Sequence, residues 1–432
     1  MPCRLVAVLF AVALAACQSS GAPNDGSNNP SQNTTVPLGQ NGNNAQNGNV
    51  PGTGVTPGNS NTTGNANNTN DTTANTNQPV GALGPSATVD ANNVRYLGRV
   101  PTATSLLTWP GTGIMASFTG TTATLNFTPQ SGTTYIGISV DGGNTTRVIL
   151  DGTTPVSVGP LSAGHHTVTA VKLNEASLGT ARFDGISTRN GITATAAPTR
   201  RIEFIGDSIT VGYGVEGTSP CRNTGALENA EKTYAALTAG VLGAQYDLIA
   251  WSGKGLLRNG ASIAPDTSAT MPILWTRVAA TDPNSAYDFP ASRTPDAVVI
   301  NLGTNDFTYI GYAADGTSSN VREPLDLAAY QAAYVNFINT VRQRYPNAVI
   351  ELCTSPMLSD FYPSEAEAQH TAQLTVLTAI VAQLGDAKIH VVEFPTQTEA
   401  GGKFGCDAHP GPAQHMAMAA VLAQHLKNDL GW

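Results

Sequence analysis

Five short apolar runs that alternate with helical stretches are the strongest constraint on the fold of the C-terminal half of the chain. The runs are Ile202–Ile205, Tyr246–Ala250, Ala297–Leu302, Val349–Cys353 and Ile389–Phe394. The helical stretches are Glu231–Leu242, Leu327–Tyr345, Glu365–Leu384 and a last one that Pro412 opens and that runs to about Asp429. Strands that alternate with helices are typical of a parallel sheet covered by helices on both faces. We therefore predict a three-layer α/β/α domain over residues 200–432.

Residues 94–190 show a different pattern, in which short alternating runs are broken by turn residues. The runs include Ala123–Phe127, Tyr135–Val140, Thr146–Leu150 and His166–Val171. Asp-Gly turns at residues 141–143 and 151–152 occur at about the spacing found in an all-β protein. We predict a β-sandwich of the jelly-roll type, followed by a short linker from Asn190 to Thr199.

Residues 18–93 have a composition that does not support a folded core. Asn, Gly, Thr, Pro and Ser dominate, and no aromatic residue occurs between Phe10 and Tyr96. No Lys, Arg or Glu occurs between Arg4 and Arg95. Such a segment cannot bury enough apolar surface to offset the entropy lost on ordering. We expect a disordered tether here.

Residues 1–17 have the pattern of a targeting signal. Arg4 precedes an apolar stretch, Leu5–Leu14, that is too short to cross a bilayer as a folded helix. The stretch ends in Leu14-Ala15-Ala16-Cys17, which resembles a bacterial lipoprotein signal with Cys17 as the lipidated new N-terminus. Because Gln18 follows, the expected destination is the outer membrane; an ordinary cleaved secretion signal is the alternative. Both interpretations predict an exported protein, and the first predicts that only a lipid anchor contacts the membrane.

The cysteines fit an exported protein. After Cys17, three thiols remain, Cys221, Cys353 and Cys406, which allow one internal disulfide and three pairings. We favour Cys353–Cys406, because both residues are expected at the same edge of the parallel sheet.

Charge limits the partners that this chain can bind. Only 12% of the residues are charged, the net charge is −9, and Lys and Arg form no dense stripe. Nucleic acids and other acidic polymers are bound by clustered cations, so they are excluded, and a neutral, hydroxyl-rich substrate fits better. No His, Cys and Asp cluster has ligand spacing, so we expect no metal or other cofactor. We expect a monomer.

Four polar motifs each follow one of the predicted strands of the α/β domain. They are Gly206-Asp207-Ser208, Ser252-Gly253-Lys254-Gly255, Gly303-Thr304-Asn305-Asp306 and Asp407-Ala408-His409. In a parallel sheet, residues just past the carboxyl ends of the strands meet at one edge. The four motifs are therefore expected to form one site.

The residue types in these motifs are those of acyl transfer by a serine. Ser208 is the expected nucleophile, His409 the base that takes its proton, and Asp407 the acid that orients the imidazole. The amides of Ser208 and Gly253 and the side-chain NH₂ of Asn305 are expected to stabilise the oxyanion.

The four motifs resemble those of the SGNH hydrolases. The short final block Asp407-Ala408-His409-Pro410 and the run Gly206–Gly217 are similar to carbohydrate esterase family 2, as is a β-sandwich before the hydrolase domain. The blocks around Glu228, Trp251–Gly255, Thr270–Pro272 and Asn301–Phe307 strengthen this resemblance. It implies an acetyl esterase that acts on plant polysaccharides such as xylan or glucomannan.

The resemblance leaves several alternatives open. Gly255 could align with the oxyanion role in place of Gly253, and some members of the family orient the histidine through a backbone carbonyl instead of through an acid such as Asp407. Trp251, Phe307 and Tyr309 could form an aromatic platform for a sugar ring, or they could belong to the core. An esterase for lipid, thioester or peptidoglycan acetyl groups, and a non-catalytic glycan-binding lipoprotein, are the alternative functions.

Overall fold

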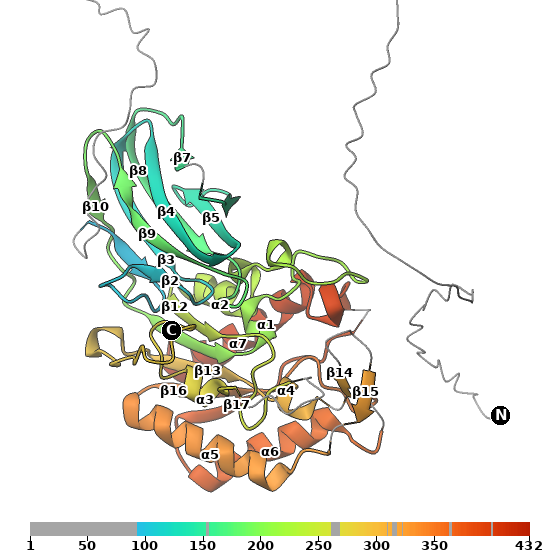
Figure 1. The fold of residues 1–432 in the computed structure, drawn as a ribbon. Coiled ribbons are helices and arrows are strands. Elements are labelled where there is room, and N and C mark those ends of the chain that lie inside the picture. The colour runs from blue at the N-terminus through green and yellow to red at the C-terminus, as the bar shows by residue number, and fades with distance from the viewer. Residues whose placement is uncertain are drawn as a thin grey trace, which may run out of the picture. The chain divides into compact units, whose positions relative to one another are not determined.

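The computed structural model describes residues 93–152, 155–260, 268–308, 310–312, 318–321, 323–362, 365–398 and 401–432 (Figure 1). The described residues do not include the expected signal with Cys17, the expected tether up to residue 92 or Tyr309. Within the described ranges, no helix is both long enough and apolar enough to cross a membrane.

A five-stranded parallel sheet forms the centre of the C-terminal part, as the alternation of strands and helices predicts. Its strands, in spatial order, are β12 (Gln245–Ala250), β11 (Arg201–Gly206), β13 (Ala297–Asn301), β16 (Val349–Cys353) and β17 (Ile389–Val392). The register aligns Gly206 with Ala250 on one side and with Asn301 on the other. The segments that follow these three strands therefore leave the sheet at the same edge.

Helices cover both faces of this sheet, which confirms the predicted three-layer arrangement (Figure 1). On one face, α5 (Leu327–Arg344), α6 (Gln369–Leu384) and the short α3 (Met271–Leu274) pack against side chains such as Ile205 and Ile300. On the other face, α2 (Tyr234–Leu242) and α7 (Pro412–Leu430) pack against side chains such as Phe204 and Val299. Because neighbouring residues of a strand point to opposite faces, the continuous apolar runs supply both cores.

The helix boundaries follow local capping. Asp326 accepts hydrogen bonds from the amides of Ala328 and Ala329 at the start of α5, and Pro412 occupies the first turn of α7. The helix expected over Glu231–Leu242 is divided, because Thr233 caps α2 and the preceding Ala230–Lys232 forms a separate 3₁₀ turn. Further short elements are α1 (Ser208–Val211), α4 (Thr304–Phe307) and a hairpin of β14 (Ile310–Tyr312) and β15 (Ser318–Val321).

Two antiparallel sheets form the preceding β-sandwich. The first contains β1 (Arg95–Leu97), β3 (Gly113–Gly120), β8 (Gly164–Lys172), β5 (Thr134–Val140) and β6 (Thr146–Leu150), with β10 (Ile192–Ala194) also paired to β3. The second contains β2 (Leu106–Leu107), β9 (Gly179–Ser187), β4 (Ala123–Gly132) and β7 (Val156–Val158). Alternate side chains of both sheets, including Phe118, Leu125 and Phe183, form a core of their own.

Buried polar contacts join the sandwich to the α/β part. The guanidinium of Arg99 donates to the Glu203 carboxylate of β11 at 2.8 Å, and both side chains are buried. The Arg99 guanidinium also lies 4.0 Å from the centre of the Tyr287 ring. The indole of Trp109 donates to the Val278 carbonyl at 3.1 Å. A sandwich side chain is thus held by a charge partner on a central strand of the hydrolase sheet.

The disulfide differs from the predicted one. Cys221 pairs with Cys406, whereas Cys353 is a buried free thiol, so the predicted Cys353–Cys406 pairing is wrong. Cys353 is the last residue of β16 and packs into the core beneath α7. Cys406 belongs to a loop that follows the last strand, and this loop lies against the segment that contains Cys221. The prediction failed because two cysteines near the same edge of a sheet need not face each other.

Candidate active site

The nucleophile turn, which we define as residues 206–212, begins where β11 ends. Gly206 is required there, because a Cβ at this position would lie 2.0 Å from Thr210 Oγ1. Asp207 caps α1 by accepting the Ile209 amide at 3.0 Å, and Ser208 occupies the first helical position. In the described part of the chain, the Ser208 amide has no hydrogen-bond acceptor. This N–H, at the first position of α1, is therefore available to a substrate.

The structure brings His409 to Ser208, although 201 positions separate them in the sequence. His409 Nε2 lies 2.9 Å from Ser208 Oγ, and His409 Nδ1 lies 3.1 Å from the main-chain carbonyl oxygen of Asp407. A carbonyl oxygen can only accept a hydrogen bond, so Nδ1 carries the ring proton and donates a hydrogen bond to the Asp407 carbonyl oxygen. Nε2 is then the acceptor for the Ser208 hydroxyl, as a general base requires.

The Asp407 carboxylate does not contact His409, which corrects the expected role of this side chain. It accepts instead from the Tyr213 hydroxyl at 3.0 Å and from the Asn223 amide at 2.9 Å. Asp407 and Ala408 have φ angles of 51° and 57°, and this left-handed turn directs the Asp407 carbonyl towards the imidazole. Asp407 therefore contacts the histidine through its main chain, and its side chain holds the loop.

Tyr213 is a site residue to which the sequence analysis assigned no role. Its ring lies over the His409 ring, with centroids 4.2 Å apart and an angle of 34° between the planes. Burial raises the pKa of the Tyr213 hydroxyl, so this group remains a donor to Asp407. Burial also lowers the pKa of His409 to about 4, so the imidazole is neutral at neutral pH. Tyr213 lies in the run Gly206–Gly217, which the sequence already marked as part of the site. The sequence did not show that the Tyr213 ring would cover His409.

The structure distinguishes the two candidate oxyanion glycines. Gly253 has a φ of 77°, and a Cβ added there would meet no heavy atom within 4 Å. Its amide has no acceptor within the described ranges. The Gly255 amide, by contrast, donates to Asn259 Oδ1 at 3.1 Å, and a Cβ at Gly255 would lie 2.0 Å from the Arg258 carbonyl oxygen. Gly253 thus offers a free donor beside open space, and Gly255 is a packing position.

Asn305 lies at the same edge of the sheet but is already engaged. Its Nδ2 donates to Asp207 Oδ2 at 3.2 Å and to the Lys254 carbonyl at 3.0 Å. Burial raises the pKa of Asp207 to about 7. For Asn305 to stabilise an oxyanion, one of these hydrogens must be shared with the substrate.

Asp306, the next residue, organises the loop that follows Gly253. Its Oδ2 accepts from the Leu256 amide at 2.9 Å, and its Oδ1 accepts from the amides of Leu257 and Arg258 at 2.7 and 2.9 Å. Three backbone donors therefore compensate this buried carboxylate. These hydrogen bonds tie the third motif to the residues that directly follow the second.

The sandwich contributes one side chain to this site, Glu175, which the sequence analysis did not identify. Its Oε2 accepts from the Ser252 amide at 2.8 Å, directly before Gly253. The Glu175 amide in turn donates to Glu228 Oε2 at 2.8 Å. Lys172 is buried beside these two carboxylates; burial lowers its pKa to about 7 and raises that of Glu228 to about 7. Glu175 thus positions, from the sandwich, the turn formed by Ser252–Gly255, which we call the Gly253 turn.

The aromatic residues expected to form a sugar platform do not share one environment. Phe307 is buried in the core and packs edge-to-face against Tyr330 with ring centroids 5.6 Å apart, which favours the core interpretation of this residue. Trp251 is half-buried and packs against the same core. Tyr309 lies outside the described residues, so its role stays a prediction.

Comparisons with known proteins agree with this division of the chain. Residues 96–198 match the family described as "Carbohydrate esterase 2 N-terminal", and residues 204–417 match the "GDSL-like Lipase/Acylhydrolase family". The chain is 36% identical to the cellulase/esterase CelE of Acetivibrio thermocellus over 330 residues, which are 75% of this chain and 38% of CelE. It is 31% identical to an acetylxylan esterase / glucomannan deacetylase of Cellvibrio japonicus, over 75% of this chain and 85% of that protein.

Solved structures give the same result. A carbohydrate esterase family 2 enzyme from Corynascus thermopiles (Myceliophthora fergusii) is 48% identical with a TM-score of 0.74, over 78% of this chain and all (100%) of that one. A family 2 esterase from Clostridium thermocellum in complex with cellohexaose is 33% identical with a TM-score of 0.68, over 78% of this chain and 99% of that one. This chain belongs to carbohydrate esterase family 2, whose members are carboxylic ester hydrolases.

Proposed function

We propose that this protein is a serine esterase that removes O-acetyl groups from plant cell-wall polysaccharide such as acetylated xylan or glucomannan. The observation that carries the proposal is the 2.9 Å contact between His409 Nε2 and Ser208 Oγ, beside the unengaged amides of Ser208 and Gly253. Relatives named acetylxylan esterase and glucomannan deacetylase support the substrate class. A low density of charge suits a neutral polymer.

In the proposed reaction, His409 Nε2 takes the hydroxyl proton as Ser208 Oγ attacks the acetyl carbonyl carbon. The negative charge that forms on the carbonyl oxygen is stabilised by the amides of Ser208 and Gly253, and by Asn305 if it shares a hydrogen with the substrate. The intermediate then breaks the ester bond, and the imidazolium returns its proton to the sugar oxygen that leaves. Water attacks the acetyl-Ser208 ester by the same route and releases acetate.

Acetate release from acetylated xylan and acetylated glucomannan tests this proposal. Ser208→Ala is expected to lower the rate by at least about 1,000-fold, because the nucleophile and base act as a unit. Ser292→Ala, at an exposed serine of the same domain, is the matched control and keeps the wild-type rate. If neither polymer releases acetate but a small aryl acetate is cleaved, the serine chemistry stands and the proposed substrate is wrong. No activity on either kind of ester would favour a glycan-binding protein.

We also propose that the protein is exported and anchored to the bacterial outer membrane through a lipid on Cys17. The motif Leu14-Ala15-Ala16-Cys17 and the Asn- and Gly-rich composition of residues 18–93 support this proposal. Membrane fractionation in a Gram-negative host tests it: Cys17→Ala should move the protein from the membrane to the soluble exported fraction. Unchanged membrane association of this variant would contradict the anchor.

A further inference from the structure

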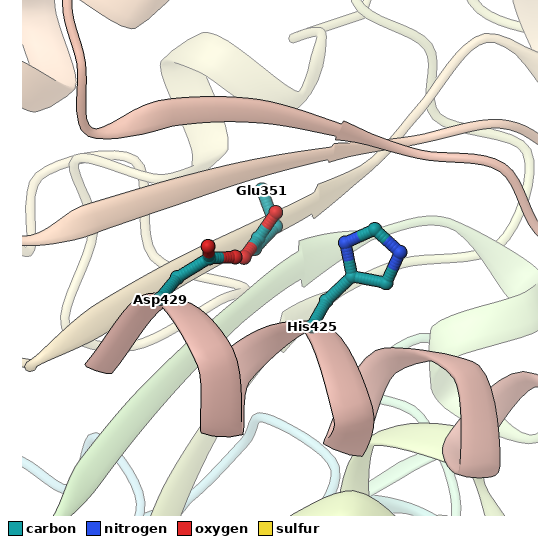
Figure 2. Close-up of side chains that lie close together, drawn as sticks. All are labelled: Glu351, His425 and Asp429. Carbon is teal, nitrogen blue, oxygen red and sulfur yellow. The ribbon is translucent and has the colours of Figure 1, made fainter. Parts of the chain in front are cut away.

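A second cluster of polar side chains lies between β16 and α7, away from the four motifs. It consists of Glu351 on the strand and His425 and Asp429 on the helix (Figure 2). One potential ligand atom from each residue lies within 4.8 Å of the other two. His425 and Asp429 are four positions apart, so one face of α7 presents both. In the described ranges, this is the one set of three or more such residues that meets this distance.

The Glu351 carboxylate lacks the compensation that buried carboxylates receive elsewhere in this protein. Apart from the neighbouring Asp429 carboxyl group, neither oxygen of the fully buried Glu351 has a hydrogen-bond partner in the described structure. Figure 2 shows it directed towards the Asp429 carboxylate. Asp306, which is also fully buried, accepts three backbone amides. An uncompensated buried carboxylate is costly, so Glu351 requires either a proton or a cation.

We propose that Glu351, His425 and Asp429 bind a divalent transition-metal ion, for which Zn²⁺ is the representative. Imidazole nitrogen and carboxylate oxygen are both zinc ligands, and water would supply the fourth ligand here. His390 on β17 adds a further polar group, since its Nε2 lies 3.9 Å from Asp429 Oδ1. The spacing of His, Cys and Asp in the sequence predicts no metal site, because these ligands come from a strand and a helix that are far apart in the chain.

The geometry is compatible with binding after a small adjustment. Ligands about 2.0–2.2 Å from a tetrahedral ion lie roughly 3.3–3.6 Å from one another. The fixed ligand is Glu351, in the middle of β16. Asp429 is exposed and His425 is partly exposed, so both side chains are able to rotate towards the ion.

The position of the cluster predicts a structural role for the ion. α7 begins at Pro412, three residues after His409, and Asp429 lies near its other end. At 1.5 Å per residue, the helix carries His425 about 20 Å and Asp429 about 25 Å from that first turn. An ion there would join the end of α7 to β16. We therefore expect it to raise the melting temperature and to leave acetate release unchanged.

The test uses the full chain, stripped with a chelator and then titrated with Zn²⁺ by calorimetry, with the melting temperature measured in parallel. One zinc per chain is expected, with a higher melting temperature in its presence. Asp429→Asn, His425→Gln and Glu351→Gln should each weaken binding by at least the roughly 10- to 100-fold that loss of a supporting residue costs. His370→Gln is the matched control: it removes a histidine 3.0 Å from the Glu393 carboxylate, outside the cluster, and should bind zinc like the wild type.

Two results would overturn the proposal. One is the absence of stoichiometric zinc binding by the wild type. If Glu351→Gln then raises the melting temperature with and without zinc, the two carboxyl groups share a proton instead of an ion. The other is zinc binding that all three variants retain, which would place the ion elsewhere. Because binding and melting are measured directly, neither result depends on the proposed esterase activity.

Discussion

The nucleophile turn and the histidine loop, which we define as residues 405–410, supply the two reacting side chains but are built in different ways. The nucleophile turn continues a buried strand into a helix, and the Asp207 side chain caps that helix by accepting from the amide of Ile209, two residues later. The histidine loop contains a single 3₁₀ turn, Cys406–Ala408. It is held by residues 213–223: the Cys406 amide donates to the Gly214 carbonyl at 3.1 Å, and the Asp407 amide donates to the Cys221 carbonyl at 2.9 Å.

The difference shows where the site stores backbone strain. In the histidine loop, the two non-glycine residues Asp407 and Ala408 have positive φ angles, a conformation that costs of order 1 kcal/mol or more at each position. Long-range contacts, including the Cys221–Cys406 disulfide and the Tyr213–Asp407 hydrogen bond, offset that cost. In the nucleophile turn the residue with a positive φ is Gly212, and glycine adopts that conformation without this cost.

Removal of the disulfide should have the largest effect. Cys221→Ser opens a covalent link between residues 185 positions apart, and we expect the free energy of unfolding to fall by about 2–4 kcal/mol. Denaturant unfolding measures this change. The folded fraction should also release acetate more slowly, since Cys406 begins the turn that carries His409.

Cys353→Ala is the control for this experiment, because Cys353 is a buried free thiol. In that variant, addition of a reductant should still lower the stability, whereas in Cys221→Ser the reductant should have no further effect. If the Cys221→Ser protein, measured without reductant, were as stable and as active as the wild type, the histidine loop would not depend on the disulfide.

The second prediction concerns pH and compares the histidine loop with an exposed histidine. His409 must be neutral to accept the Ser208 proton, so activity is lost as pH falls through its pKa. Burial lowers that pKa to about 4. At pH 5 most of the enzyme should therefore remain active, whereas a histidine with the ordinary pKa of about 6.5 would be only about 3% neutral. The pH profile of kcat/KM for a soluble acetate ester measures this limb.

Tyr213→Leu should move the acid limb of this profile upwards, because it opens the face of the imidazole to water. Tyr213→Phe, which keeps the ring, should leave the limb near its wild-type position. An acid limb near pH 6.5 in the wild type would contradict the lowered pKa of His409.

The third prediction extends the comparison to the Gly253 turn, which the sandwich supports through Glu175. Glu175→Ala removes the acceptor of the Ser252 amide and leaves that N–H without a partner. An unsatisfied donor costs about 1–3 kcal/mol, so we expect the turn to shift and to move the Gly253 amide away from the oxyanion, which should lower kcat roughly 10-fold. KM should change little. Glu175→Gln retains an acceptor oxygen and should restore most of the rate; equal rates in all three proteins would show that the sandwich does not position this turn.

The same contrast explains how much of the molecule the sequence could predict. The parallel sheet, its helices and the convergence of Ser208, Gly253 and Asn305 follow from local patterns, because each motif ends a strand. The roles of Tyr213, Glu175 and the Cys221–Cys406 pair depend on segments that meet only in the folded chain. For Phe307 the sequence left two roles open, since an aromatic residue near a strand end can point either into the core or into a cleft.

The carboxylate of Asp407 is the last support of the histidine loop and the one expected to matter least for the rate. Its side chain binds Tyr213 and Asn223, while its main-chain carbonyl, which substitution leaves in place, accepts from His409. Asp407→Asn keeps a side-chain acceptor for both partners. We expect a loss of less than about 10-fold, well below the loss of roughly 10⁴-fold that follows removal of a true triad acid.

The most direct test of the account is therefore kcat/KM for acetate release from one acetylated polysaccharide, measured for the wild type, Asp407→Asn and Ser208→Ala. We predict that Asp407→Asn stays within about 10-fold of the wild type, while Ser208→Ala loses at least about 1,000-fold. A loss in Asp407→Asn as large as that in Ser208→Ala would contradict the claim that the main chain orients the catalytic histidine.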